Sequence, residues 1–395
     1  MFKKSLAAVA LLGAFAGSAF AADVTLYGVV DEGFLYTHKD ADKTDTDAVD
    51  KFELRNGIQA GSRWGLKGTE DLGNGLKVGF ILESGFNADD GTQSVSGTMF
   101  NREASLNVMG PFGQLSLGKI GAITQGTSSW GKVGAVSAFG TSYGAANVGN
   151  ATNVFAATVG VMDNTIAYQT PKFAGFTVYA QYSMGSSKAA TKDSTGASNT
   201  QVENESSTDR YYALGATYAN GPVNLYFAVD SVNYASYFDK NVNAVPNVDD
   251  SLTVAFGGSY DFSVVKVFAG AQYFDEVLVG KVSGLSNVGL DLLKNKMEGY
   301  ALQASASAPL AGGTGYFGVG YVDASEADSV AASDAFDIKY YVASVGYKYD
   351  LSKRTNVYGV LSYAKGDQDV TTASATVYDR KPSMVGFGIG LRHNF

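Results

Sequence analysis

The sequence predicts an all-β protein, a 16-stranded antiparallel transmembrane β-barrel with short periplasmic turns and long extracellular loops. Three observations support this fold class. Apolar and polar residues alternate with a period of two in many segments, as they do in strands, where successive side chains point to opposite faces. The connections between these segments alternate between short and long. The last segment continues to the final residue.

The hairpin at residues 62–87 shows the alternation most clearly. Trp64 and Leu66 alternate with Arg63 and Lys67, and the second strand repeats the pattern. One face is therefore continuously apolar, and the other carries Arg63, Lys67, Lys77 and Glu83. Repeated around a closed sheet with the apolar face outward, this pattern describes a wall between lipid and water.

Sixteen segments alternate in this way, at approximately 23–36, 53–71, 75–88, 98–110, 113–120, 163–170, 174–184, 208–219, 223–234, 251–260, 265–275, 297–307, 315–323, 336–350, 355–365 and 384–395. Seven short connections lie at 71–74, 111–112, 171–172, 220–222, 261–264, 308–314 and 351–354. Eight long polar connections lie at 37–52, 89–97, 121–162, 185–207, 235–250, 276–296, 324–335 and 366–383. An even number of strands with both termini on the short-turn side is typical of an outer-membrane barrel, and a barrel of this width keeps an aqueous lumen.

Residues 1–21 have the pattern of a signal peptide. Lys3 and Lys4 precede an apolar run at 6–15, and Ala19-Phe20-Ala21 matches an A-x-A cleavage site. The apolar run is shorter than the roughly 20 residues that a membrane-spanning helix needs. We therefore expect cleavage before Ala22 and a single barrel domain over residues 22–395.

Composition excludes several classes of function. Loss of Lys3 and Lys4 leaves 27 of the 29 basic residues against 38 acidic ones, so the net charge falls from −9 to −11, which argues against nucleic-acid binding. There is no cysteine for a disulfide or a thiolate. His38 and His393, the only histidines, are far apart in the chain and suggest neither a metal site nor a catalytic base. We expect no enzyme activity, no metal and no cofactor.

Several segments resemble one known family. They are VTLYGVVDEGF (24–34), SRWGLKGTEDLGNGLKVGFILESGFN (62–87), NREASLNVMGPFGQLSLGK (101–119), YQTPKFAGFTVYAQY (168–182), YDLSKRTNVYGVLSY (349–363) and GLRHNF (390–395). In this order they resemble the Gram-negative general porins found in Neisseria, Burkholderia and related bacteria. The terminal Phe395 is typical of outer-membrane barrels, where assembly machinery reads it.

The resemblance implies a specific assembly and partners. It implies homotrimers in the bacterial outer membrane, surrounded by lipid that includes lipopolysaccharide and built by the barrel-assembly machinery. Each barrel would have a water-filled pore for ions and small hydrophilic solutes. An inward-folded third loop, here about residues 121–162, would narrow this pore.

Passive diffusion needs a polar lining and a field across the narrowing rather than catalytic residues. Arg63 and Lys67 are the best candidates, because alternation places them opposite Trp64 and Leu66. The alternative is that Arg63 pairs with Glu83 or Asp31 and stiffens the wall. Asp31 shares a face with Tyr27 and Val29, but neighbouring Glu32 takes the opposite face, so we expect one of these two carboxylates near a rim.

Arg102 and Lys119 do not fit simple alternation. Arg102 has the spacing of Ala104, Leu106 and Val108, a lipid-facing set, so it faces the lumen only after a bulge or beyond the strand end. The family motif nevertheless implies a constriction arginine at this place. Lys119 has the same difficulty and is expected to mark the entry to the third loop.

The third loop is rich in small residues and contains Lys132, with no Asp or Glu between Glu103 and Asp163. General porins often oppose acidic loop residues to basic wall residues, and this sequence departs from that pattern. We therefore expect a net positive constriction built from Arg63, Lys67 and Arg102, with a weak preference for anions. Acidic residues in the other loops, such as Asp40, Asp42 and Glu203, argue for cations at the mouth, but salt screens charges over about 8–10 Å.

Two alternatives to a general diffusion pore remain. Aromatic residues near strand ends favour interfacial girdles, but a sugar-stacking track in a saccharide-specific channel is a second interpretation; the residues are Tyr168, Phe173, Phe176, Tyr218, Tyr260, Phe262, Tyr347, Tyr349 and Tyr358. A surface protein whose barrel is only an anchor is the other alternative, although small anchors have far fewer strands.

Overall fold

The computed structural model describes residues 23–43, 46–148, 151–155, 159–186, 191–192, 198–199, 203–204, 208–234, 249–278, 296–327, 335–371 and 377–395. The predicted signal peptide, residues 1–21, lies outside these ranges. No helix within them is long and apolar enough to cross a membrane.

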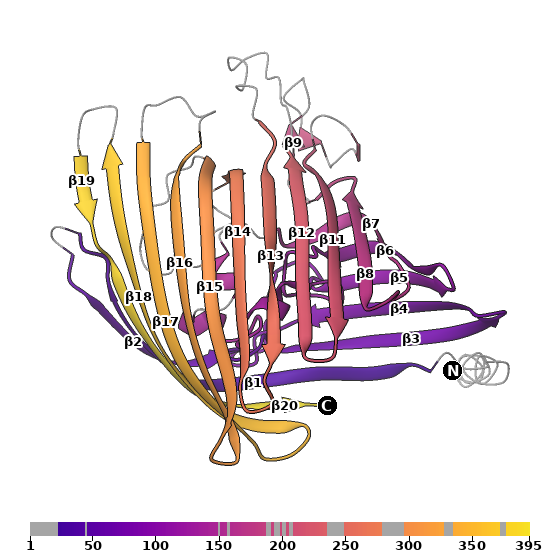
Figure 1. Ribbon diagram of the computed structural model, residues 1–395, viewed down its shortest axis with the longest axis horizontal. Coiled ribbons are helices and arrows are strands. Elements are labelled where there is room, and N and C mark those ends of the chain that lie inside the picture. The colour runs from indigo at the N-terminus through magenta and orange to yellow at the C-terminus, as the bar shows by residue number, and fades with distance from the viewer. Residues whose placement is uncertain are drawn as a thin grey trace, which may run out of the picture.

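Antiparallel strands close into one barrel, with β1 paired to β20 (Figure 1). The sixteen barrel strands are β1 (Thr25–Asp40), β2 (Val49–Asn56) continued by β3 (Arg63–Gly73), β4 (Leu76–Gly85), β5 (Glu103–Gly110), β6 (Gly113–Gly121), β7 (Val161–Gln169), β8 (Phe176–Ser183), β11 (Arg210–Asn220), β12 (Val223–Asn233), β13 (Leu252–Asp261), β14 (Lys266–Leu278), β15 (Lys296–Leu310), β16 (Gly313–Glu326), β17 (Ala335–Asp350), β18 (Thr355–Thr371), and β19 (Val377–Arg380) continued by β20 (Ser383–Asn394). The predicted 16-stranded barrel is confirmed, and every predicted strand overlaps an observed one.

Few other elements occur in the described ranges. Strands β9 (Thr191–Lys192) and β10 (Ser198–Asn199) form a separate two-stranded pair. The connection between β6 and β7 contains three single-turn helices, η1 (Val133–Val136), η2 (Gly144–Ala146) and α2 (Ala151–Val154).

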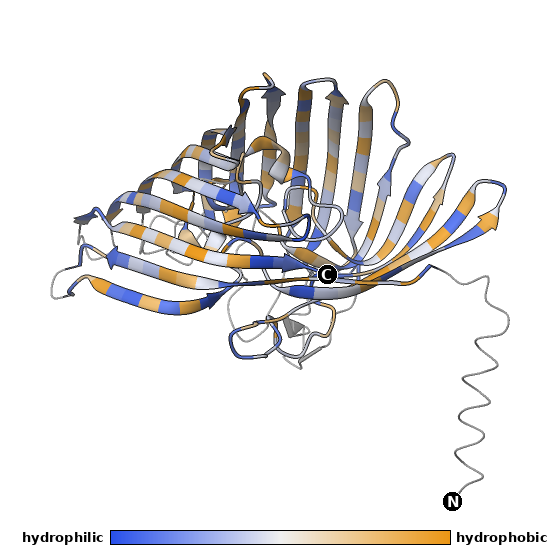
Figure 2. Cartoon of the chain, turned by 90° about the horizontal axis from the view of Figure 1, so that it is seen from below, coloured by the Kyte–Doolittle hydropathy of each residue, from blue (hydrophilic) through white to orange (hydrophobic). Residues whose placement is uncertain are grey.

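Hydrophilic and hydrophobic residues alternate along the strands of the wall (Figure 2), and its two faces differ accordingly. Leu106, Leu117 and Ile166 are cross-strand neighbours on the outer face, and each is exposed. Ser105 and Ser116 lie on the inner face of the same strands and are buried. Large apolar side chains on the outside are stable only in lipid or against another subunit, so the wall has the polarity of a membrane barrel.

The second predicted strand, 53–71, is interrupted in the structure. Residues 57–62 leave the sheet between β2 and β3, starting at Gly57, whose φ of 70° lies in the left-handed region. The segment folds inward, where Ile58 is fully buried in a cluster with Leu35 and Val360. This inward fold places new hydrogen-bond donors beside β1.

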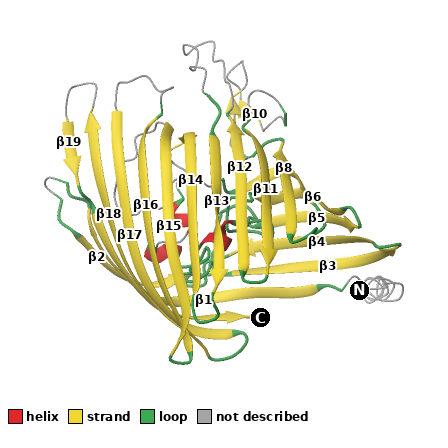
Figure 3. Cartoon of the chain, in the orientation of Figure 1, coloured by secondary structure: helices red, strands yellow, loops and turns green. Residues whose placement is uncertain are grey.

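The third loop crosses the inside of the barrel, where its helices appear among the strands (Figure 3). Trp130, Val133 and Val136 belong to the largest apolar core, together with inward-facing residues of β11 to β18. This core lies inside the barrel because those wall residues alternate with exposed, outward-facing ones.

Glycines on the wall make room for the loop. A Cβ atom at Gly215 would lie 2.6 Å from Cδ1 of Ile123, and one at Gly320 would lie 2.4 Å from Cγ2 of Val154. A Cβ atom at Gly257 would lie 2.9 Å from Cγ1 of Val136. The wall strands therefore need glycine where the loop contacts them.

Candidate pore constriction

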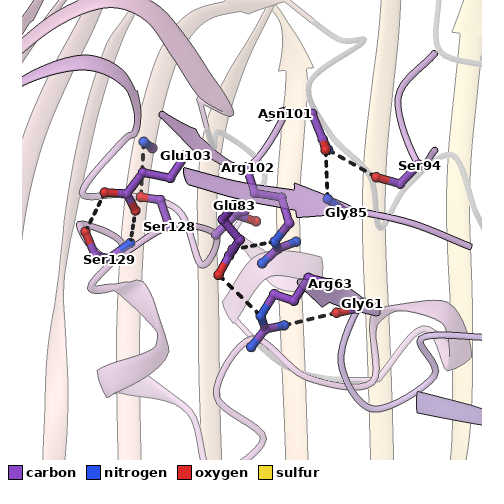
Figure 4. Close-up of polar contacts among 12 residues, drawn as sticks. Gly61, Arg63, Glu83, Gly85, Ser94, Asn101, Arg102, Glu103, Ser128 and Ser129 are labelled. Atoms are coloured by element: carbon purple, nitrogen blue, oxygen red, sulfur yellow. Dashed lines mark hydrogen bonds and ion pairs between the residues drawn. The ribbon is translucent and has the colours of Figure 1, made fainter. Parts of the chain in front are cut away.

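A carboxylate between two arginines forms the centre of the site (Figure 4). Glu83 projects inward from β4, and its Oε1 lies 2.7 Å from Nε of Arg102. Its Oε2 lies 3.7 Å from Nε of Arg63 and accepts a hydrogen bond of 3.0 Å from the Tyr27 hydroxyl. Glu83 thus orients both arginines and compensates part of their charge.

Arg102 reaches this site because its strand has not yet begun. Strand β5 starts at Glu103, and the Arg102 amide donates to the Glu83 carbonyl oxygen over 3.2 Å. Alternation along β5 therefore does not govern Arg102, which resolves its predicted conflict with the lipid-facing set. Lys119 lies at a register shift between Gly118 and Ile120, where its Nζ is 2.6 Å from Oδ1 of Asp163.

Arg392 is a third arginine at the site, and the sequence analysis did not single it out. It lies on β20, and its Nε and Nη2 donate to Oδ1 of Asn394 over 3.3 and 3.2 Å. Barrel closure places it in register with Asp31 of β1. The sequence indicates its inward position, because Arg392 has the opposite parity to the apolar, outward-facing Ile389 and Leu391.

The three arginines line one cavity of about 350 Å³ across from the third loop. The rest of the lining is neutral: Ala60, Gly61, Gln125, Gly126, Thr127, Thr141 and Ser142. The loop side of the cavity thus offers hydroxyl and amide groups, and no carboxylate opposes the guanidinium groups there.

Asp31 does not line water, contrary to its prediction as a pore residue. Its side chain is fully buried in the middle of β1, so neither it nor Glu32 lies at a rim. The inward-folded segment explains this, because the Ala60 amide donates to Oδ2 over 2.5 Å. The Tyr358 hydroxyl donates to Oδ1 over 2.5 Å.

Lys67 and Lys132 lie outside the lining of this cavity. Lys67 is exposed, with its Nζ 5.2 Å from the centre of the Tyr27 ring. Lys132 Nζ donates to the Ser129 carbonyl oxygen over 2.8 Å and lies 5.4 Å from the Tyr179 ring. Burial lowers the pKa of Lys132 from its ordinary value.

Glu103 is a residue of the site that the sequence analysis did not single out. It is 1% exposed and sits opposite Glu83 on the inner face. Its carboxylate accepts hydrogen bonds from the Ser129 amide and hydroxyl over 2.8 and 2.9 Å. It therefore fixes the third loop to the wall. The sequence could have indicated its inward position, because Glu103 alternates in step with Ser105 and Asn107 on the inner face.

Asp230 fixes the start of the same loop to β12. It is 3% exposed on β12, and its Oδ2 accepts from the Thr124 hydroxyl over 2.7 Å and the Tyr211 hydroxyl over 2.9 Å. Gln181 adds a third attachment, accepting from the Ile123 amide over 2.9 Å and donating to the Gly121 carbonyl oxygen over 3.0 Å. The loop is thus bonded to β5, β8 and β12.

The aromatic residues fit a girdle with one exception. Phe176 packs against Tyr218, and Tyr260 against Phe262, at centroid distances of 4.6 and 4.5 Å on the outer side, with the rings tilted to each other. Tyr358 instead faces inward, is 5% exposed and binds Asp31. Its prediction as an interfacial residue is therefore wrong.

Comparison with known proteins agrees with this geometry. A family model described as "Gram-negative porin" matches residues 7–369. An outer membrane porin of Bordetella pertussis is 34% identical and one of Delftia acidovorans is 31% identical, each over the full length of both chains. The solved structure of an anion-selective porin from Comamonas acidovorans covers 95% of this chain and 100% of its own, with 26% identity and a TM-score of 0.66.

Proposed function

Because the chain belongs to the Gram-negative porin family, it forms a diffusion channel in the outer membrane, and we propose that its constriction weakly prefers anions. It is a channel rather than an enzyme. Ions and small hydrophilic solutes cross it passively through the aqueous lumen.

The single observation that carries the anion preference is the cavity lined by Arg63, Arg102 and Arg392 with a neutral loop opposite. Acidic groups are present, but they lie behind the arginines: Glu83 is 8%, Glu103 1% and Asp31 0% exposed. An ion in the cavity is therefore closer to the guanidinium groups than to the carboxylates. The similar porin from Comamonas acidovorans is anion-selective, which supports the same sign for this chain.

The test is a reversal potential measured on purified protein in a planar bilayer under a KCl gradient. We expect the sign of chloride preference, and a cation sign overturns the proposal. Conductance that saturates with one sugar would instead indicate a saccharide channel. Absence of conductance would indicate an anchor.

We further propose that the channel works as a homotrimer. A structure of Vibrio cholerae OmpT, which has the same fold, is described as its trimer form, and this supports an oligomer for the present chain. The outer wall exposes large apolar side chains such as Leu106, Leu214 and Phe256, which lipid or a neighbouring subunit can cover. A heat-modifiable band at the monomer mass alone, in mild detergent, would contradict the trimer.

The mature protein in this proposal begins at Ala22, after removal of residues 1–21, and residues 22–395 form the single barrel. The terminal Phe395 supports recognition by the barrel-assembly machinery, and its amide and carbonyl pair with Gly28 over 3.1 and 3.0 Å at the barrel seam. The exposed outer wall would contact lipid, including lipopolysaccharide. Mass spectrometry of the protein from outer membranes tests the cleavage site.

A further inference from the structure

A second cavity lies below the constriction, at the short-turn end of the barrel. We call it the periplasmic vestibule. Its volume is about 690 Å³, within the range of small-molecule sites. It shares the lining residues Ser142 and Arg392 with the constriction cavity, so the two spaces are adjacent. The turn at 351–354 and the underside of the third loop line it.

The vestibule carries an excess of positive charge. Its lining includes Lys348, Lys353, Arg354 and Arg392 against a single acid, Asp350. Asp350 is paired with Lys348 at 3.0 Å. Lys353, Arg354 and Arg392 have no ion pair within the described ranges, so three cationic groups face this space together.

The backbone around these groups is ordered by hydrogen bonds. The Ser352 hydroxyl oxygen accepts from the amides of Arg354 and Thr355, each over 3.1 Å. The Asn394 amide donates to the Arg354 carbonyl oxygen over 2.8 Å, while its side-chain oxygen binds Arg392. Asn394 therefore joins the turn to the closing strand and keeps the cationic groups on one side of the vestibule.

Clustered cations suit ligands with several negative charges, because each ligand charge gains from each fixed charge. Ser352, Thr355 and Asn356 add polar groups to the same lining. We propose that the periplasmic vestibule binds polyvalent oxyanions, specifically phosphates and phosphate esters, that enter from the periplasmic side. The inference rests on the proposed anion preference, since the constriction above it must accept the same sign of charge.

Sided block of a single channel tests this proposal. Tripolyphosphate is added to one side and then the other of a planar bilayer in about 0.1 M KCl, where charges act over about 10 Å. We expect a clearly lower half-blocking concentration when tripolyphosphate is added to the periplasmic side than when it is added to the other side. The double variant Lys353→Gln/Arg354→Gln should raise that concentration about tenfold on this side, because two charges are lost near a polyvalent ligand.

Controls separate the vestibule from the constriction. Lys172→Gln removes a lysine from another exposed short turn and should leave the block unchanged. Lys353→Arg/Arg354→Lys keeps both charges and should keep the block. The reversal potential without tripolyphosphate tests the proposed anion preference separately, so a failure of the vestibule proposal can be distinguished from a failure of the anion preference. Equal block from both sides, or a double variant that behaves like Lys172→Gln, overturns the vestibule proposal.

Discussion

Replacing Arg63 by glutamine tests the sign and size of the field at the constriction. Arg63 is suited to this test because Glu83 keeps its shorter contact, 2.7 Å, with Arg102 after the change. Glu83 is therefore not left without a charged partner. The variant should fold, and its effect should be electrostatic.

The cavity volume sets the expected magnitude. A sphere of about 350 Å³ has a radius of about 4.4 Å, so an ion inside it lies about 5 Å from a lining charge. At that distance in water one charge contributes about 0.8 kcal/mol, which screening at 0.1 M salt reduces to about 0.5 kcal/mol. The same term favours anions and disfavours cations, so loss of Arg63 should lower the chloride-to-potassium permeability ratio about fivefold.

The assay is the reversal potential under a KCl gradient, measured beside two controls. Arg63→Lys keeps the charge and should keep most of the selectivity. Lys172→Gln removes the charge of an exposed residue that does not line the cavity and should change little. If Arg63→Gln leaves the reversal potential unchanged, or if Arg63→Lys shifts it equally, the electrostatic reasoning is refuted.

Three further changes have defined outcomes. Glu83→Gln removes the carboxylate between two arginines. It should raise the chloride preference, measured as the reversal potential, and lower the stability by about 1–3 kcal/mol, measured by heat-modifiability. Unchanged values of both would contradict the role of Glu83 in compensating the arginines. Gly320→Val places atoms where Val154 of the third loop packs, and overpacking costs about 1–3 kcal/mol. Single-channel conductance should change, whereas an unaltered conductance with intact folding would mean that the loop does not need this glycine. Thr124→Val removes a hydroxyl that donates to the buried Asp230 and should increase current flicker at a cost of about 1 kcal/mol. The control is Thr92→Val, which removes a hydroxyl that donates to the exposed Asp90 outside the third loop; equal flicker in both variants would argue against a loop attachment at Asp230.

The strands and their faces could be predicted because alternation is a local property. Each strand's own residues determine which side chains can face lipid, and this was sufficient to direct Arg63 and Glu83 inward. The number of strands followed from counting such segments. The sequence also showed that the third loop lacks carboxylates, and the neutral loop edge of the constriction cavity follows from that absence.

The composition of the site could not be predicted because it depends on closure and on loops. Arg392 reaches the other arginines only when β20 pairs with β1. Asp31 is buried only because residues 57–62 fold inward and donate to it. Glu103 acts through Ser129, a loop residue 26 positions away. Strand periodicity contains no information about these contacts.

The arrangement also explains why the expected selectivity is weak. Arg63, Arg102 and Arg392 face one small cavity and repel one another, so nearby acids favour folding. Glu83 supplies that compensation directly, while Glu103 and Asp31 are occupied in binding the third loop and the inward segment. The same carboxylates that stabilise the constriction reduce its net positive charge, so removing them should increase selectivity and decrease stability together. Strong anion selectivity would need acidic residues outside the lumen to compensate the charge of the arginines. The described residues of this wall do not provide such acids.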